Sequence, residues 1–263
     1  MTASSPPSGS PPTSVPPEAP AYGGPSALSR FFLALGLSPK AFQLPFRRVD
    51  WLLPFLLVLA FTLVSSFILR DLFAAAQVDQ AKQQIESNER LSAEQREEAL
   101  DRITTGSAAG AMRWGPVIGA VVMVPLGALL AAVILMLILN FGMGGQTKLR
   151  DLWFLSILSY APKTIGAILF TSVAMARSTI DVSFGPAALL PPDITPLKTF
   201  LRAFDLFEIW VFVIQLIGVG IVTGLPVKKA RTGVVILWVI YLLFMLLTSL
   251  ATGCMSGGMG ARG

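Results

Sequence analysis

The fold is decided by residues 115–141, which read GPVIGAVVMVPLGALLAAVILMLILNF and carry no charged side chain. A helix that rises about 1.5 Å per residue needs roughly 20 such residues to cross about 30 Å of hydrocarbon. Four further apolar runs reach or nearly reach that length, at 51–69, 152–176, 204–225 and 232–252. The sequence therefore predicts an all-α membrane protein in which residues 51–252 form a bundle of five transmembrane helices.

The composition agrees with a protein that lies in a lipid bilayer. Hydrophobic residues make up 54% of the chain and charged residues 13%, with a mean hydropathy of +0.69, whereas about 25% of the residues of a soluble domain are charged. The net charge is +5. Basic residues of membrane proteins gather in short cytoplasmic loops, next to anionic lipid headgroups. We therefore take the positive charge as a sign of membrane orientation and expect no nucleic-acid partner.

Two residue types that carry much of enzyme chemistry are almost missing. The sequence contains no histidine, and its one cysteine is Cys254. Sites that need a histidine ligand, an imidazole base or an internal disulfide are thereby excluded. We expect no catalytic residue, no metal site and no cofactor, and hence no enzyme.

The segments that flank the bundle differ in composition. Residues 1–27 are mostly Pro, Ser, Gly and Ala, which predicts a disordered cytoplasmic tail without a cleaved signal peptide. Residues 28–50 place Arg30 and Lys40 among apolar side chains, which indicates an amphipathic segment in the membrane interface. The alternative for 28–50 is a collar packed on the protein's own helices. Residues 253–263 are expected to be a flexible tail.

The charged loop 70–113 is the one sizeable hydrophilic segment. Within it, Ser92 and Gln95 have the spacing of a capping box and predict a helix that runs through Leu100 and Ile103. We expect a short helical hairpin outside the membrane.

The distribution of Lys and Arg predicts the orientation. The turns at 142–150 and 226–231 carry basic residues directly at helix ends, where the positive-inside rule acts most strongly, whereas the opposite loops mix basic with acidic residues. We therefore expect a cytoplasmic N-terminus and a C-terminus outside.

Lys163, Asp205 and Glu208 form a candidate polar cluster inside the membrane. An unpaired charge at the centre of a span costs about 2.5–3.5 kcal/mol. Glu208 and Lys163 differ in depth by only about 6 Å if Arg202 marks the outer interface, so the two side chains can pair. The cluster is either an ion pair that pins two helices, which we favour, or part of a proton or ion relay that could include Gln215.

Proline and glycine mark further points along the spans. Pro162 deprives the Leu158 carbonyl of its helical donor and predicts a kink in the third span. The candidate helix-packing residues have the four-residue spacing of small-xxx-small motifs and are Gly115 with Gly119 and Gly220 with Gly224. We favour packing inside the bundle and leave homo-oligomerisation open.

Three segments resemble a known family over residues 38–250, the Ypt/Rab-interacting-protein (Yip) domain family in its bacterial branch. The first is Ser-Pro-Lys-Ala-Phe at 38–42, followed by Trp51 and Pro54. The second comprises the glycine turn at 141–145 and the segment 152–162. The third and most specific is Phe-Asp-Leu-Phe-Glu-Ile-Trp at 204–210, followed by Gly218, Gly220 and the basic turn at 228–230.

The resemblance implies five membrane helices, a cytoplasmic N-terminus, an outward C-terminus and no enzyme activity. Eukaryotic members act in vesicle traffic with small GTPases, but no residue of this sequence independently indicates a GTPase-binding site. The resemblance to the bacterial branch implies a location in the bacterial cytoplasmic (inner) membrane.

Two functional hypotheses follow. The first is a non-enzymatic integral membrane protein that organises membrane or cytoplasmic protein partners, or lipids of the bilayer, through its cytoplasmic arm and basic turns. The second is a small transporter or channel-like protein that uses Lys163, Asp205 and Glu208.

Overall fold

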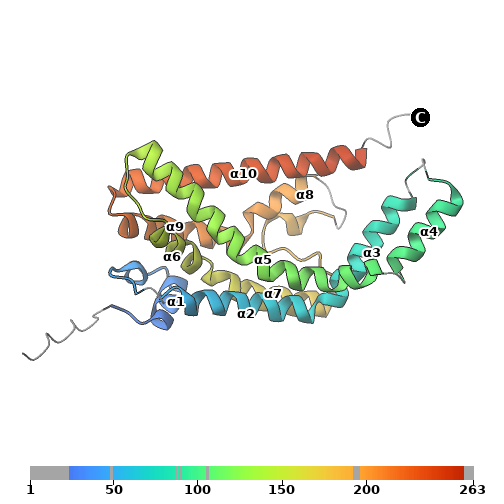
Figure 1. Cartoon of the computed structure of the whole chain (residues 1–263), viewed down its shortest axis with the longest axis horizontal. Coiled ribbons are helices and arrows are strands. Elements are labelled where there is room, and N and C mark those ends of the chain that lie inside the picture. The colour runs from blue at the N-terminus through green and yellow to red at the C-terminus, as the bar shows by residue number, and fades with distance from the viewer. Residues whose placement is uncertain are drawn as a thin grey trace, which may run out of the picture.

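The computed structural model describes residues 24–47, 50–86, 88, 91–104, 107–191 and 196–257, and these residues contain helices and loops but no strand. Figure 1 shows an elongated helical bundle with α1 (Ala27–Leu35) packed near one end. The pair α3 (Arg70–Glu86) and α4 (Ala93–Thr104) projects from the other end. The predicted disordered tail comprises residues 1–27, of which residues 1–23 lie outside the described part of the chain. Its last residue, Ala27, is the first residue of α1.

The apolar runs form the long helices of the bundle. Four helical stretches are long and apolar enough to cross a membrane, and α2 with α3, which bend by 62° at their junction, make a fifth candidate. The all-α membrane fold predicted from the sequence is confirmed. The helices concerned are α2 (Leu52–Ile68), α5 (Ser107–Leu137), α6 (Leu149–Ser159), α7 (Ala161–Arg177), α9 (Leu206–Thr223) and α10 (Val227–Gly257).

The ends of several helices differ by a few residues from the ends of the predicted spans. α5 begins well before residue 115 and ends in a short π-helix, Ile138–Gly142. α9 begins two residues later than predicted, because Asp205 caps it. α10 begins at Val227 and continues through Gly257, into the segment expected to be a flexible tail. Hydropathy marks the apolar part of a helix, and capping residues and polar turns extend or shorten it on either side.

The third span is interrupted where Pro162 predicts a kink. α6 ends at Ser159 and α7 begins at Ala161, with Tyr160 between them. Pro162 lies in the first turn of α7, where its missing amide hydrogen costs little. The interruption leaves one long apolar stretch, Leu149–Arg177.

The charged loop forms the predicted hairpin. α3 (Arg70–Glu86) and α4 (Ala93–Thr104) pack on each other and on the start of α5. Both bonds of the capping box are present: Gln95 N donates to Ser92 Oγ at 3.2 Å, and Ser92 N donates to Gln95 Oε1 at 3.0 Å. Arg113 and Asp71, 2.8 Å apart, join the hairpin to α5.

The N-terminal segment forms the collar that the sequence offered as the alternative. α1 (Ala27–Leu35) and the 3₁₀ helix η1 (Pro39–Phe42) bury Phe31, Ala34 and Phe42 against the bundle. Other large side chains of the segment, such as Phe32, remain exposed. One face of the segment is therefore part of the core, and the other is free to meet lipid.

Arg30 holds this collar together from within. Its side chain is fully buried and donates to the carbonyl oxygens of Ala41 and Gln43 at 2.9 and 2.8 Å. Its guanidinium carbon lies 5.0 Å from the ring centre of Phe46, and its Nε lies 3.7 Å from the Asp50 carboxylate. A residue that the sequence suggested as an interfacial charge thus organises the entry to the first span.

Candidate functional site

Lys163 and Glu208 form a direct ion pair between two of the long helices. Lys163 Nζ donates to Glu208 Oε1 at 2.7 Å and joins α7 to the first turn of α9. Lys163 lies 14 residues from either end of the stretch 149–177 (163 − 149 and 177 − 163). Its Nζ also lies 4.6 Å from the ring centre of Tyr160. The pair that the sequence suggested is therefore present.

This ion pair is not sealed from its surroundings. The Lys163 side chain is 34% exposed and that of Glu208 27%. A pair with this exposure holds two helices together and still offers a polar surface inside the membrane.

Asp205 has a different role from the one expected of it. Its carboxylate accepts hydrogen bonds from the backbone N–H of Phe207 at 3.0 Å and of Phe184 at 2.8 Å. Asp205 thus caps α9 and ties the preceding loop to the helix start. The spacing of Asp205 and Glu208 is that of a capping box, and this signal could have identified the cap from the sequence. In a capping box the side chain of Glu208 would accept from the Asp205 N–H, but here it accepts from Lys163 Nζ.

A second polar contact joins α6 to α9. Gln215 Nε2 donates to Ser159 Oγ at 3.4 Å, and Ser159 Oγ donates to the carbonyl of Ser156 at 2.8 Å. Gln215 Oε1 and Trp210 Nε1 are buried without a hydrogen-bond partner in the described part of the protein. Buried polar atoms of this kind commonly bind water. The sequence singled out Gln215 but neither Ser159 nor Trp210.

The glycines chosen from the small-xxx-small pattern do not hold the helices of this chain together as predicted. A Cβ added at Gly115 or Gly119 meets no atom within 4 Å, so these residues are not at a close helix contact within the chain. Gly220 makes only ordinary contact with Val227, and Gly224 ends α9 with a φ of 66°. Four-residue spacing identifies a small-residue stripe but not the side of the helix that meets a neighbour.

Close approach occurs at other glycines instead. A Cβ on Gly218 would lie 2.6 Å from Leu155 Cδ1 and 2.8 Å from Phe42, and one on Gly233 would lie 2.5 Å from Leu139. Gly218 therefore lets α9 pack against α6 and the collar at the same time.

One end of the bundle gathers the exposed cations of three chain segments. The glycine turn after α5 and the turn before α10 adjoin there, since Gly142 and Met143 line a cleft together with Lys228 and Lys229. The helix α1 of the collar packs near the same end (Figure 1). Asp50 is buried beside Arg30, and Asp151 lies 3.2 Å from Arg150. We call this surface the basic end. Among the described residues, its exposed cationic side chains are Lys40, Arg47, Lys148, Arg150, Lys228, Lys229 and Arg231.

The glycine turn at the basic end is held by Asn140. The side chain of Asn140 accepts from the Thr147 N–H and hydroxyl, both at 2.8 Å, and donates to the Thr147 carbonyl at 3.1 Å. Gly144 has a φ of 69°, a conformation that favours glycine. These contacts close the loop between α5 and α6 and fix its position beside the start of α10.

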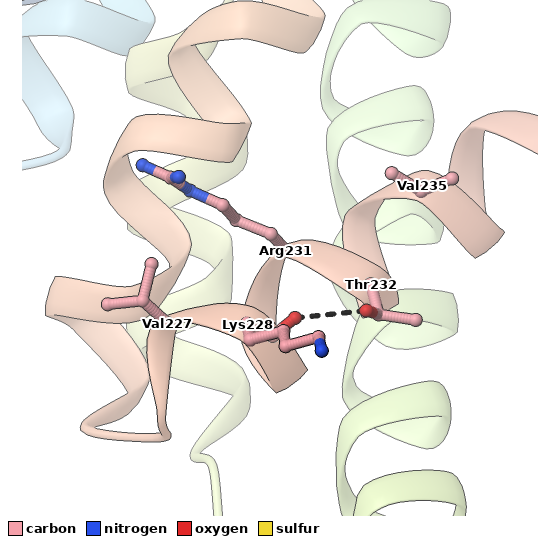
Figure 2. A pocket seen from close by; sticks show the side chains of 5 residues that line it. All are labelled: Val227, Lys228, Arg231, Thr232 and Val235. Carbon is pink, nitrogen blue, oxygen red and sulfur yellow. Dashed lines mark hydrogen bonds between the residues drawn. The ribbon is translucent and has the colours of Figure 1, made fainter.

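Two adjoining clefts lie at the start of α10. The larger has a volume of about 440 Å³ and is lined by Val227, Lys228, Arg231, Thr232 and Val235 (Figure 2). The smaller, of about 330 Å³, shares Lys228 and Thr232 and adds Lys229 and the glycine turn. Figure 2 shows the Thr232 hydroxyl donating to the Lys228 carbonyl, at 2.9 Å, while Arg231 extends toward α9.

Long apolar helices, an ion pair within them and a cation-rich end define a multi-pass α-helical membrane protein. Residues 33–249 match the Yip1 domain, and the chain belongs to the Yip1 domain family. No curated protein and no solved structure shows a significant match to the chain.

Proposed function

We propose that this Yip1-domain protein is a non-enzymatic organiser of the membrane that gathers acidic protein partners or anionic lipids at its basic end. The observation that carries the proposal is the convergence of cations from the collar and two turns on one surface, where the acidic groups of the described residues are buried or paired. Such a surface attracts anionic headgroups and acidic protein segments over about a Debye length.

The same charges support an orientation with the basic end in the cytoplasm of a bacterium. α2 has 17 residues, which reaches the lower limit for a span, and α3 carries charged residues along its length, including Asp71, Asp79 and Lys82. These features favour α2 as a complete span and α3 as a helix outside the hydrocarbon. Five spans then place the C-terminus on the opposite side from the N-terminus.

Crosslinking in intact membranes tests the proposed function. A photoreactive residue at Arg150 would be compared in three backgrounds: the natural sequence, K148Q/K228Q/K229Q, and the control K82Q/R102Q/R113Q, which removes three charges from the hairpin end. We expect the natural protein to give one reproducible crosslinked protein or lipid. This product should be lost in K148Q/K228Q/K229Q and kept in the control. Equal recovery from both variants, or no enriched product, would contradict the proposal.

The tail can be tested separately from the collar. Deletion of residues 1–23 ends before the Ser26 cap and leaves Arg30 and its partners intact. Loss of the same product in this deletion would assign part of the recruitment to the tail. A longer deletion, through residue 37, would remove α1 and so would confound recruitment with misfolding.

Transport is a second candidate, favoured by the exposure of the Lys163–Glu208 pair. It is also favoured by the buried atoms Gln215 Oε1 and Trp210 Nε1, which have no hydrogen-bond partner among the residues that the structure describes. Protein reconstituted in liposomes would be loaded with a pH-sensitive dye and given a proton gradient. A relay requires proton flux that stops in the K163M/E208Q variant. Flux equal to that of protein-free liposomes would rule out a proton relay.

A further inference from the structure

We propose that the cleft at the start of α10 binds the headgroup of an anionic phospholipid of the surrounding bilayer. The inference rests on the proposed function and names a ligand class for one part of the basic end. Two cationic residues, one threonine and two valines line the cleft. They are Lys228, Arg231, Thr232, Val227 and Val235 (Figure 2).

The charge of the cleft fits a phosphate group. No acidic residue is among its lining residues, and Lys228 also borders the smaller cleft, where Lys229 adds a third cation. Arg231 Nε donates to the Leu216 carbonyl at 3.3 Å, which anchors the guanidinium beside α9. The remaining guanidinium donors suit bidentate contact with phosphate oxygens, and a lysine ammonium serves as a mobile point charge.

The surface next to the cleft matches the rest of a lipid molecule. From Arg231 the exposed residues at successive four-residue steps of α10 are Val235, Val239 and Leu243, which are 45%, 49% and 53% exposed. Residues four apart lie close together on one side of a helix. Cations followed by exposed aliphatic side chains reproduce the order of a phospholipid, phosphate first and hydrocarbon after it. This continuity favours a lipid over a soluble anion or an acidic protein segment.

The position in the membrane agrees with this occupant. α10 is long and apolar enough to span from Val227 to Ala251, so Lys228 and Arg231 lie within its first two turns. Basic residues at this level of a span meet the phosphate layer. The headgroup would rest on the cations, and an acyl chain would lie along the valines.

Native mass spectrometry of the purified full-length protein in micelles tests the site. Equal amounts of phosphatidylglycerol and phosphatidylcholine would be added, and the ratio of the two bound lipids measured for the natural protein and for K228Q/R231Q. The matched control is K82Q/R102Q, which removes two charges from the hairpin α3–α4 at the other end of the bundle. Unchanged melting temperatures would establish that all three proteins are folded.

We expect the natural protein and the control to retain phosphatidylglycerol preferentially, and K228Q/R231Q to lose at least about tenfold of that preference. The charge-conserving variant K228R/R231K should keep it. Equal loss in the control and in K228Q/R231Q would overturn the site in favour of general surface attraction. Displacement of the lipid by millimolar inorganic phosphate would overturn it in favour of a soluble anion.

Failure of this site and failure of the proposed function give different results. A natural protein without any headgroup preference overturns the lipid site, whereas a crosslinked protein partner at the basic end still supports the broader proposal. The reverse combination, a headgroup preference without a crosslinked protein, restricts the basic end to lipid.

Discussion

Arg30 is the residue on which the collar depends most. Its guanidinium donates to four backbone carbonyls, those of Pro25, Ala41, Gln43 and Pro45. It also lies beside the buried carboxylate of Asp50. Removing a buried charge leaves the groups around it without their donors, and that penalty exceeds the net stabilisation that the intact pair contributes.

Replacing Arg30 by Met should therefore lower the free energy of unfolding by about 3–5 kcal/mol. R30K should recover only part of this loss, because an ammonium cannot reach carbonyls on several sides as a guanidinium does. Reversible unfolding in mixed micelles, followed by circular dichroism, measures both. Equal stability of R30M and the natural protein would show that the collar does not need its central charge.

Two glycines of the spans should respond in opposite ways to the same substitution. In G218A the new methyl group meets Leu155 and Phe42, which are both buried and have little room to move. Such overpacking should cost about 1–3 kcal/mol. In G119A the methyl group meets open space, and the better helix propensity of alanine should make the change neutral or stabilising by up to about 1 kcal/mol.

Thermal unfolding of both variants in the same detergent checks this pair of predictions. A loss of stability in G119A would indicate that Gly119 packs against a second copy of the chain. The oligomeric state measured by light scattering would then separate that contact from a fold defect.

At the scale of elements, one ion pair joins α7 to α9. Lys163 Nζ and Glu208 Oε1 lie 2.7 Å apart, and the break at Tyr160 positions Lys163 in the first turn of α7. If the pair pins the helices, K163M and E208Q should each destabilise the protein by about 1–3 kcal/mol. The double variant should cost less than the sum of the two, because neither charge is left without its partner.

A double-mutant cycle on unfolding free energies measures this coupling. Strictly additive losses would mean that the two side chains contribute independently and that the pair does not pin the helices. The cycle also prepares the transport test, because it identifies the variant that removes both charges and remains folded.

The features that could be predicted from the sequence are local ones. Hydropathy over about 20 residues identified the apolar helices, and the Ser92–Gln95 spacing identified the start of α4, because both depend on neighbours along the chain. The Lys163–Glu208 pair followed from the cost of an unpaired charge in hydrocarbon, which limits the choice of partners.

The features that could not be predicted depend on tertiary contacts. The burial of Arg30 requires carbonyl groups of the following loop, which a periodicity of apolar residues does not reveal. Gly218 lies on a helix face that meets neighbouring elements, whereas Gly119 lies on a face that meets none within this chain. The spacing of glycines along the sequence does not reveal this difference. The capping contacts of Asp205 were missed because its position at a helix start was read as a position within the span.

At the scale of the whole molecule, the proposed topology separates the charges of the two ends. Reporter enzymes that are active on only one side of the membrane, fused to either terminus, should place the N-terminus in the cytoplasm and the C-terminus outside. Termini on opposite sides require an odd number of spans. Because four other stretches can span, α2 must then be the fifth span. Both termini on one side would instead leave four spans, with α2 and α3 outside the count.

The Lys163–Glu208 pair has an electrical consequence for a protein in an energised membrane. A paired cation and anion carry no net charge, so the transmembrane voltage exerts almost no net force on them. An unpaired charge that moves through the full field gains or loses about 2.3 kcal/mol per 100 mV. Pairing therefore removes the net charge that either side chain alone would present to the field, and E208Q would leave Lys163 with a net charge on which the voltage acts.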